Sequence, residues 1–289
     1  MHDFSIEYLR CIRCSSKFEV DVLYRDNEIT EGFLECKNCN ILSPIVNGIP
    51  IIWNGFANYA SQRMTLVGRL FRQARHEKMK NFLKSALPAK LRLDDRSKLE
   101  EKWVKIYQNS KDSKFYTIVK RELQNISCSD VVLEYGCSIG LITDMLADNC
   151  KEVFGIDRSY EAIMLAKNSK KKNLDYFVAD SLSSIFGDKK FNLVVALNLL
   201  ELVEPLDFLN NVSHQISHGY FVISSPYDFE RGYNSVNNPV DETSLRINLK
   251  NLGFTISQNT ANPSYLNWKL KINERCTLDY KVDLVIANK

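Results

Sequence analysis

The second half of the chain alternates short apolar runs with longer segments in which apolar residues recur every three or four positions. The apolar runs predict strands over residues 131–134, 153–157, 176–180, 191–198 and 220–225. Helical spacing of apolar residues predicts helices over residues 141–149, 160–169, 206–216 and 243–252. Strands that alternate with helices in this way specify a doubly wound α/β sheet. Two closing strands, at residues 254–258 and 280–287, have no helix between them, so we expect the seventh strand to be antiparallel.

The first 53 residues have a different pattern, in which strand-like alternation lies between two pairs of cysteines. Residues 18–24 and 32–35 alternate as strands do. The cysteines form two Cys-x-x-Cys pairs, Cys11 with Cys14 and Cys36 with Cys39. Two such pairs supply the four thiolates of a closed tetrahedral site, which predicts a structural zinc ion and not a catalytic one. The alternatives are four unrelated cysteines or a redox pair.

The segment from residue 54 to residue 95 lacks strand alternation and is rich in Arg and Lys. Its apolar residues recur at near-helical intervals, which predicts a helical run between residues 66 and 87. One interpretation is a basic helix that binds nucleic acid or an anionic membrane surface. The other is an amphipathic connector whose basic face is solvated. Residues 96–127 predict one or two more helices, in which Tyr107 or Tyr116 either contacts substrate or packs in the core.

The overall composition changes this interpretation little. The chain has 289 residues, a net charge of +3 and 45% apolar residues, which are ordinary values for a globular protein. No apolar run approaches the roughly 20 residues of a membrane span, and the first residues lack a signal pattern, so we expect a cytoplasmic protein. We expect three parts: a small β-rich zinc ribbon at residues 1–53, a helical connector at residues 54–95 and an α/β domain at residues 96–289.

The candidate chemistry begins at the turn after the first strand of the α/β domain. Gly136 and Gly140 permit a ligand to approach the backbone closely, as in sites for NAD, FAD or S-adenosylmethionine. Glu134, at the end of that strand, would repel a pyrophosphate and attract a sulfonium cation. The next two strands also end in acids, Asp157 and Asp180, which suit the ribose hydroxyls and the adenine amino group of the cofactor. Together these charges favour S-adenosylmethionine.

These residues carry a resemblance that extends over residues 97–289. The motifs Glu-Tyr-Gly-Cys-Ser-Ile-Gly, Phe-Gly-Ile-Asp and Val-Ala-Asp-Ser-Leu, in this order and spacing, resemble class I S-adenosylmethionine-dependent methyltransferases. The resemblance implies a doubly wound, seven-stranded Rossmann-like methyltransferase sheet. It also implies a cofactor site, which we expect at Glu134, Gly136, Cys137, Gly140, Asp157, Arg158, Asp180, Ser181 and Asn198. Ser138 stands where the family has its middle glycine.

Two narrower resemblances concern the N-terminal unit and the acceptor side. The four cysteines and the stretch Pro-Ile-Val-Asn-Gly-Ile-Pro resemble the Trm112-like zinc ribbons, which activate methyltransferases or are fused to their N-termini. Asn-Leu-Leu at residues 198–200 and Ser-Pro-Tyr at residues 225–227 resemble the methyltransferase domain of ovothiol-forming enzymes. The Thr-Trp that usually follows in those enzymes is Asp228-Phe229 here, so their substrate is not carried over.

The catalytic candidates are polar side chains that we expect near the transferred methyl group. A sulfonium methyl is already activated, so alignment of the nucleophile supplies much of the acceleration, and a base is needed only if the nucleophile must lose a proton. The candidates are Asn198, Glu201, Tyr227 and Tyr107, although Glu201 is also explained as a charge at a helix start. No histidine falls at a strand end, so we predict no histidine base. Residues 227–238 and 262–268 are candidate loops over the pocket.

The function that these observations favour is methyl transfer from S-adenosylmethionine to a small molecule, with zinc as a structural ion. The alternative is an RNA or protein methyltransferase that docks its substrate on the ribbon and the basic helix. A third interpretation is a non-catalytic binding module that keeps the fold as a scaffold. The intact set of Glu134, Gly136, Gly140, Asp157 and Asp180 argues against it.

Overall fold

The strands of the α/β domain form where the apolar runs predict them. The computed structural model describes residues 1–87, 95–126, 130–230 and 236–289. The five parallel strands are β5 (Val131–Tyr135), β6 (Glu152–Asp157), β7 (Leu174–Ala179), β8 (Leu193–Leu197) and β9 (Tyr220–Ser225). Most of their residues are buried, because helices cover both faces of a parallel sheet.

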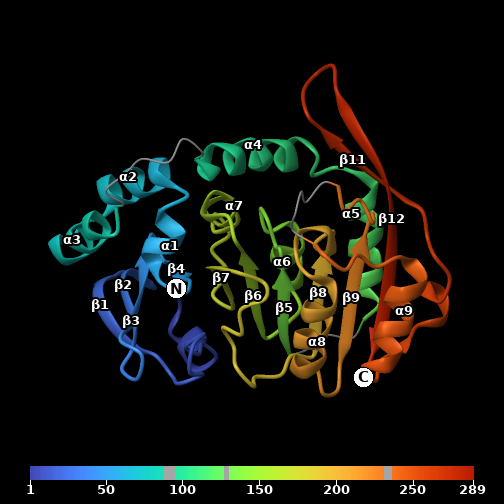
Figure 1. The fold of residues 1–289 in the computed structure, drawn as a ribbon, viewed down its shortest axis with the longest axis horizontal. Helices are drawn as coiled ribbons and strands as arrows, with labels where there is room; N and C mark the ends of the chain where they lie inside the picture. Colours follow the sequence, from blue (N-terminus) through green and yellow to red (C-terminus); the bar gives the residue numbers. More distant parts are fainter. Residues whose placement is uncertain (88–94, 127–129, 231–235) are drawn as a thin grey trace.

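The last strands close the sheet in the antiparallel direction, as expected. β12 (Thr277–Asn288) lies antiparallel between β9 and the short β10 (Thr255–Ile256). The seven strands therefore follow the order β7-β6-β5-β8-β9-β12-β10, which confirms the predicted fold class. One strand was missed: β11 (Leu266–Lys271) pairs with the first half of β12, and this hairpin projects beyond the sheet (Figure 1). Residues 266–268, predicted as a loop, belong to it.

Helices cover the two faces of the sheet and separate its core into two layers. The helices and 3-10 turns of this part are α6 (Leu141–Leu146), α7 (Tyr160–Ala166), η2 (Leu200–Leu202), α8 (Pro205–Gln215), α9 (Glu242–Asn251) and η3 (Gln258–Thr260). Residues of α6 and α7 pack with Val132 and Val195 on one face, whereas α8 and α9 pack with Leu133 and Val194 on the other. Successive strand residues point to opposite faces, which explains why adjacent residues belong to different layers.

The N-terminal unit is an antiparallel β-meander that joins the edge of the same sheet. Its elements are η1 (Asp3–Glu7), β1 (Glu19–Arg25), β2 (Ile29–Cys36), β3 (Ile41–Val46) and β4 (Ile49–Ile52). β4 pairs in parallel with β7, with Ile51 opposite Val178 and Ile52 opposite Ala179. The buried Asp175 of β7 accepts hydrogen bonds from His2 N (2.7 Å) and Ser5 Oγ (2.5 Å). The boundary at residue 53 stays a prediction, and strand pairing crosses it.

Within its described residues, up to residue 87, the connector contains three short helices, where the sequence predicts one helical run. They are α1 (Phe56–Ala60), α2 (Met64–Gln73) and α3 (Glu77–Ser85). The helical conformation ends after α2, because Ala74 is extended. The Glu31 carboxylate of β2 accepts the backbone N–H groups of Arg75 (2.8 Å) and His76 (2.9 Å). A tertiary partner thus replaces the helical hydrogen bonds at this point. The His76 side chain then caps α3 by accepting from Lys78 N.

Two further helices precede the first strand of the α/β domain, as expected for residues 96–127. They are α4 (Arg96–Asn109) and α5 (Lys114–Gln124). α4 lies across the carboxyl ends of the central strands (Figure 1), and α5 packs against β11, where the ring centroids of Phe115 and Trp268 lie 5.9 Å apart. Within the part of the chain that the structure describes, no helix has both the length and the apolar character to cross a bilayer.

Candidate functional site

A cavity of about 770 Å³ lies between α4 and the carboxyl ends of the central strands. It opens where β5 and β8 lie side by side and the strand order reverses, the usual place for a ligand in an open α/β sheet. The sequence-predicted residues that line it are Glu134, Gly136, Cys137, Asp157, Arg158, Asp180, Ser181, Asn198 and Tyr107. The fold therefore brings most of the predicted site together from separate elements.

The glycine turn lies on the floor of this cavity and requires left-handed backbone. Gly136 has φ +66°, Ser138 has φ +50° and Gly140 has φ +77°. Gly140 is not among the residues that line the cavity. It is the N-cap of α6, and a Cβ at this position would lie 2.5 Å from the Tyr176 hydroxyl. Glycine at residue 140 is therefore needed both for its dihedral angle and for close packing.

Two carboxylates beside the turn, the buried Glu134 and the half-buried Asp157, have no ion-pair partner among the described residues. Glu134 is 3% exposed and accepts a hydrogen bond from Thr143 Oγ1, and burial raises its pKa to about 8. Asp157 accepts the backbone N–H groups of Ser138 (3.0 Å) and Ser159 (2.8 Å), and burial also raises the pKa of Asp157. Buried carboxylates of this kind are completed by a ligand that brings positive charge or hydroxyl donors.

Asp180 and Cys137 contribute different chemistry to the same cavity. The Asp180 carboxylate accepts the backbone N–H of Leu182 (2.9 Å), which orients it at the end of β7. Cys137 is 3% exposed, and burial raises the pKa of its thiol well above the ordinary value. A thiol in that state is a poor nucleophile, which agrees with its expected position as a small residue facing the cofactor.

Asn198 is held at the end of β8 by two hydrogen bonds to Ser224 of β9. Its backbone N–H donates to Ser224 O, and its Oδ1 accepts from Ser224 Oγ, both at 2.9 Å. Its φ is +53°, a conformation that asparagine adopts more readily than most residues. No partner within the described chain accepts from its amide NH₂ group, so this donor is available to a ligand.

Two of the catalytic candidates, Tyr227 and Glu201, are not among the residues that line the cavity. Tyr227 donates its hydroxyl to Asp283 (3.0 Å), which also binds Arg246 at 2.6 Å. Burial and the Asp283 charge raise the pKa of Tyr227, so its phenol is not a proton acceptor. Glu201 is fully buried in η2. Sequence spacing placed both near strand ends, but it does not specify which way a side chain turns.

The roof of the cavity was largely missed by sequence analysis. α4 contributes Arg96, Glu100 and Trp103 in addition to Tyr107, and β11 contributes Trp268. The alternation of apolar and polar residues in Leu266–Lys271 was a signal in the sequence that could have predicted a strand with Trp268 on its buried face. Of the candidate loop 227–238, only Asn237 and Asn238 line the cavity, and residues 231–235 lie outside the described part of the chain.

The basic connector supports this roof through inward-facing arginines. Arg63 is 1% exposed and binds both carboxylate oxygens of Glu100, with Nη2 to Oε1 at 2.6 Å. Arg69 forms ion pairs with Glu101 and Glu161. Arg63 also stacks on Tyr59, whose hydroxyl donates to the carbonyl of Arg158 (3.1 Å). The connector thus ties α4 to the loop that follows Asp157.

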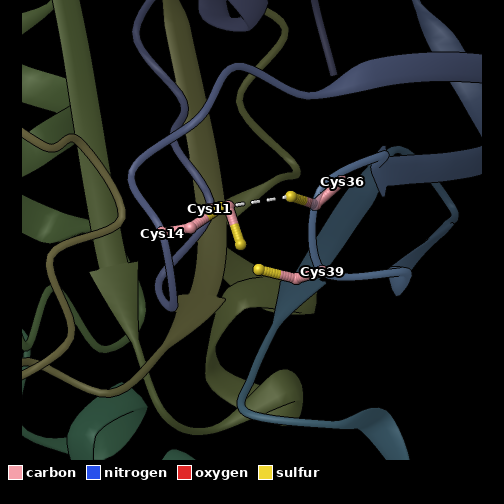
Figure 2. Close-up of side chains that lie close together, drawn as sticks. All are labelled: Cys11, Cys14, Cys36 and Cys39. Atoms are coloured by element: carbon pink, nitrogen blue, oxygen red, sulfur yellow. Dashed lines mark hydrogen bonds between the residues drawn. The ribbon is translucent and has the colours of Figure 1, made fainter.

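The four cysteines of the N-terminal unit converge on one point (Figure 2). Their sulfur atoms all lie within 4.8 Å of one another, and the Sγ atoms of Cys14 and Cys36 are 3.5 Å apart. Tetrahedral zinc thiolate sites place sulfur atoms roughly 3.8 Å apart, given Zn–S bonds of about 2.3 Å. Four soft donors at this spacing fit a closed zinc site, as the two Cys-x-x-Cys pairs predict.

Comparison with known proteins identifies the class to which the α/β part belongs. Residues 133–223 match the family model described as a methyltransferase domain. Residues 133–223 therefore carry a methyltransferase domain, which agrees with the principal resemblance and with the observed strand order. The weaker resemblance to ovothiol-forming enzymes gains no support from these comparisons and stays a prediction.

Individual relatives share only part of their length with this chain. A probable cobalt-precorrin-6B C(15)-methyltransferase (decarboxylating) of Methanococcus vannielii is 34% identical over 92 residues, which are 28% of this chain and 49% of that protein. A probable ribosomal RNA small subunit methyltransferase A of Thermococcus sibiricus is 30% identical over 117 residues, 39% of this chain and 37% of that protein. The chain thus spans less than half the length of either relative.

A solved structure shares the fold over a longer stretch. It is a chain from a complex between the Haloferax volcanii Trm112 methyltransferase activator and a putative methyltransferase. The match covers 65% of this chain and 96% of that chain, with a TM-score of 0.53 and 15% sequence identity. At that identity the similarity concerns the fold alone.

Proposed function

We propose that this protein transfers a methyl group from S-adenosylmethionine to a small-molecule acceptor. The observation that carries the proposal is one cavity lined by a glycine turn, by Glu134, Asp157 and Asp180, which have no ion-pair partner among the described residues, and by aromatic side chains. S-adenosylmethionine supplies an electrophilic methyl group on a sulfonium ion. Asp157 would bind the ribose hydroxyls, Asp180 the adenine amino group, and Glu134 the positive end of the cofactor.

The residues around Asn198 would align the acceptor. Asn198 is oriented by Ser224 and offers an amide donor to the cavity. No histidine lies in the described cavity wall, and Tyr107 is the remaining catalytic candidate there. This arrangement suits an acceptor that needs positioning and exclusion of water more than proton removal. The accepting atom would be nitrogen, oxygen or sulfur.

A small molecule is favoured over RNA or protein because of how the basic segment is used. Two arginines of that segment form intramolecular ion pairs with α4 and α7, and α4 roofs the cavity. Among the described residues of the segment, Arg72, Arg75, Lys78 and Lys84 remain exposed, so the inward use of Arg63 and Arg69 is what favours the small molecule. An RNA or protein methyltransferase stays the alternative, and the two relatives described above differ in substrate class.

The direct test is isothermal titration calorimetry with S-adenosylmethionine and S-adenosylhomocysteine. The wild type should bind both, and Asp157→Asn should weaken binding by about 10- to 100-fold, because the ribose loses a charged acceptor. Asp188→Asn, which changes an exposed acid outside the cavity, is the matched control. A wild type that binds neither compound would refute the proposal. Salt-dependent RNA binding that disappears in Arg72→Gln would support the alternative.

A further inference from the structure

Thr143 is a buried polar residue that lies behind the cavity wall. It is the third residue of α6, its exposed fraction is 0%, and it is not among the described residues that line the cavity. Its hydroxyl donates a hydrogen bond to the Oε2 atom of Glu134, which does line the cavity. A threonine hydroxyl has one proton to donate. That proton is therefore used on Glu134 and not on a ligand.

This hydrogen bond crosses the glycine turn and joins α6 to β5. In a helix, a threonine hydroxyl commonly bonds to the backbone carbonyl three or four positions earlier, which here belongs to Gly140 or Ile139. The Thr143 hydroxyl instead reaches the side chain of a residue nine positions earlier, on the neighbouring strand. The contact therefore determines the direction in which the Glu134 carboxyl group points.

The stability of the fold does not explain this buried polar pair. Glu134 is 3% exposed, and the residues packed on the same face of the sheet, such as Val132 and Ile142, are apolar. Burying a carboxyl group and a hydroxyl costs free energy that one hydrogen bond offsets only in part. Apolar residues of the same shape at both positions would be neutral or stabilising. The pair is therefore better explained by a ligand that binds Glu134.

Thr143 also opposes the protonation of Glu134. Burial raises the pKa of Glu134 to about 8, the hydrogen bonds from Thr143 lower it, and the charge of Asp157 at the end of β6 raises it. A hydrogen bond that is donated to a carboxylate stabilises the ionised form. Without Thr143, burial and the Asp157 charge would both favour the neutral acid.

The other titratable groups around Glu134 do not replace this contact. Burial chiefly raises the pKa values of Cys137 in the turn and Tyr176 of β7, and the charge of Glu134 adds to both shifts. In α6, Asp144 forms an ion pair with Lys171 at 3.2 Å. The β8 residues in the cavity wall are uncharged, and no cation among the described residues contributes to the pKa of Glu134. A positive charge for Glu134 must therefore come from a ligand.

From these contacts we propose that Thr143 is a positioning residue, whose hydroxyl orients the Glu134 carboxylate for the positive charge of the cofactor. The inference rests on the proposed function, in which Glu134 binds the positive end of S-adenosylmethionine. Thr143 acts only through Glu134, because it does not line the cavity itself. Loss of one hydrogen bond to a charged group should weaken cofactor binding near neutral pH by about tenfold.

The test is a double-mutant cycle, measured by calorimetry with S-adenosylmethionine on the full chain at pH 7. Thr143→Val and Thr143→Ala remove the hydroxyl, and each should weaken binding by about tenfold. Thr143→Ser keeps the hydroxyl and should stay within about twofold of the wild type. In the Glu134→Gln background, Thr143→Val should change the affinity by less than about twofold, because the carboxylate that it serves is absent.

The outcomes of this cycle separate the inference from the proposed function. Equal losses in the two backgrounds, or unchanged affinity in both Thr143→Val and Thr143→Ala, would overturn the role of Thr143 while the proposed function stands. A wild type that binds no S-adenosylmethionine would overturn the proposed function, and the inference with it.

Proton release on binding is a second readout, which a purely structural role would not change. Titrations in buffers of different ionisation enthalpy count the protons released, and Glu134→Gln gives the part that does not come from Glu134. The Glu134 part should fall by half near pH 8 in the wild type and about one pH unit higher in Thr143→Val. Thr260→Val removes a buried hydroxyl outside the cavity and should keep the wild-type curve. Coinciding curves for the wild type and Thr143→Val would overturn the inference.

Discussion

At the scale of single residues, burial of a carboxyl group that has no ion-pair partner among the described residues marks the cofactor site. A carboxyl group in the unfolded chain has full access to water, whereas Glu134 in the folded protein is enclosed and its pKa is raised to about 8. The folded protein therefore keeps a proton that the unfolded chain loses near pH 4.5. A cationic cofactor would favour the ionised form, so folding, protonation and binding are coupled at this one residue.

The sign of this coupling leads to a prediction for Glu134→Gln. Because the folded state binds more protons between about pH 4.5 and about pH 8, the free energy of unfolding of the wild type should fall across this interval. The variant lacks this proton, so it should match the wild type near pH 5 and exceed it in stability at pH 9. Urea denaturation at several pH values measures the difference, with Glu274→Gln, at an exposed site, as the reference. A constant difference at every pH would contradict the prediction.

At the scale of elements, α4 connects the cofactor end, the acceptor end and the basic connector. Its Glu100 lines the cavity and forms a bidentate ion pair with the buried Arg63, while Ser110 just beyond its end holds β11. These contacts fix the position of α4 over the cavity. Sequence analysis described the segment that contains Arg63 by its charge alone. In the structure, the Arg63 side chain is buried and supports α4 through its ion pair with Glu100.

Arg63→Met should therefore destabilise the protein and loosen the roof. Removing one partner of a buried ion pair leaves Glu100 uncompensated, which costs about 3 kcal/mol in the free energy of unfolding. The affinity for S-adenosylmethionine should fall as well, because Tyr59 and the Arg158 loop lose their support. Arg72→Met changes an exposed arginine of the same segment and should alter stability by less than about 0.5 kcal/mol. Similar free energies of unfolding for both variants in urea denaturation would contradict a supporting role for Arg63.

At the scale of the whole molecule, the N-terminal unit extends the methyltransferase sheet. Without β4, the strand β7 would be an exposed edge with unpaired backbone groups next to Asp180. A unit of about 50 residues has a small core, so its stability depends on cross-links such as a metal site. We propose that one zinc ion bound by Cys11, Cys14, Cys36 and Cys39 holds this unit and, through β4, the edge of the sheet.

The zinc proposal predicts one zinc ion per chain by mass spectrometry of acid-released metal. Cys11→Ser, at a buried cysteine of the cluster, should lose the metal and show faster amide hydrogen exchange in β7 as well as in the ribbon. Cys276→Ser, at an exposed cysteine of the hairpin loop, should keep both properties of the wild type. A metal-free wild type would refute the site. Metal loss with unchanged exchange in β7 would show that the ribbon does not support the sheet.

Much of the fold could be predicted because its information is local. The periods of the apolar residues located the parallel strands, and the two Cys-x-x-Cys pairs located the cluster. The break between α2 and α3 could not be predicted, because its cause is Glu31, which lies more than 40 residues earlier in the chain. The inward turn of Tyr227 toward Asp283 has the same kind of cause, a partner 56 positions away.

By itself, the sequence determined the alternation of strands and helices, the acids and glycines of the cofactor turn, and the cysteine cluster. Each of these depends on residue type and on spacing over a few positions, which the backbone enforces locally. Only the tertiary structure decided that β4 completes the sheet, that the basic connector turns inward, and that α4 and β11 bring Tyr107 and Trp268 together. Those contacts join residues far apart in the chain, so packing and burial, and not local preference, select them.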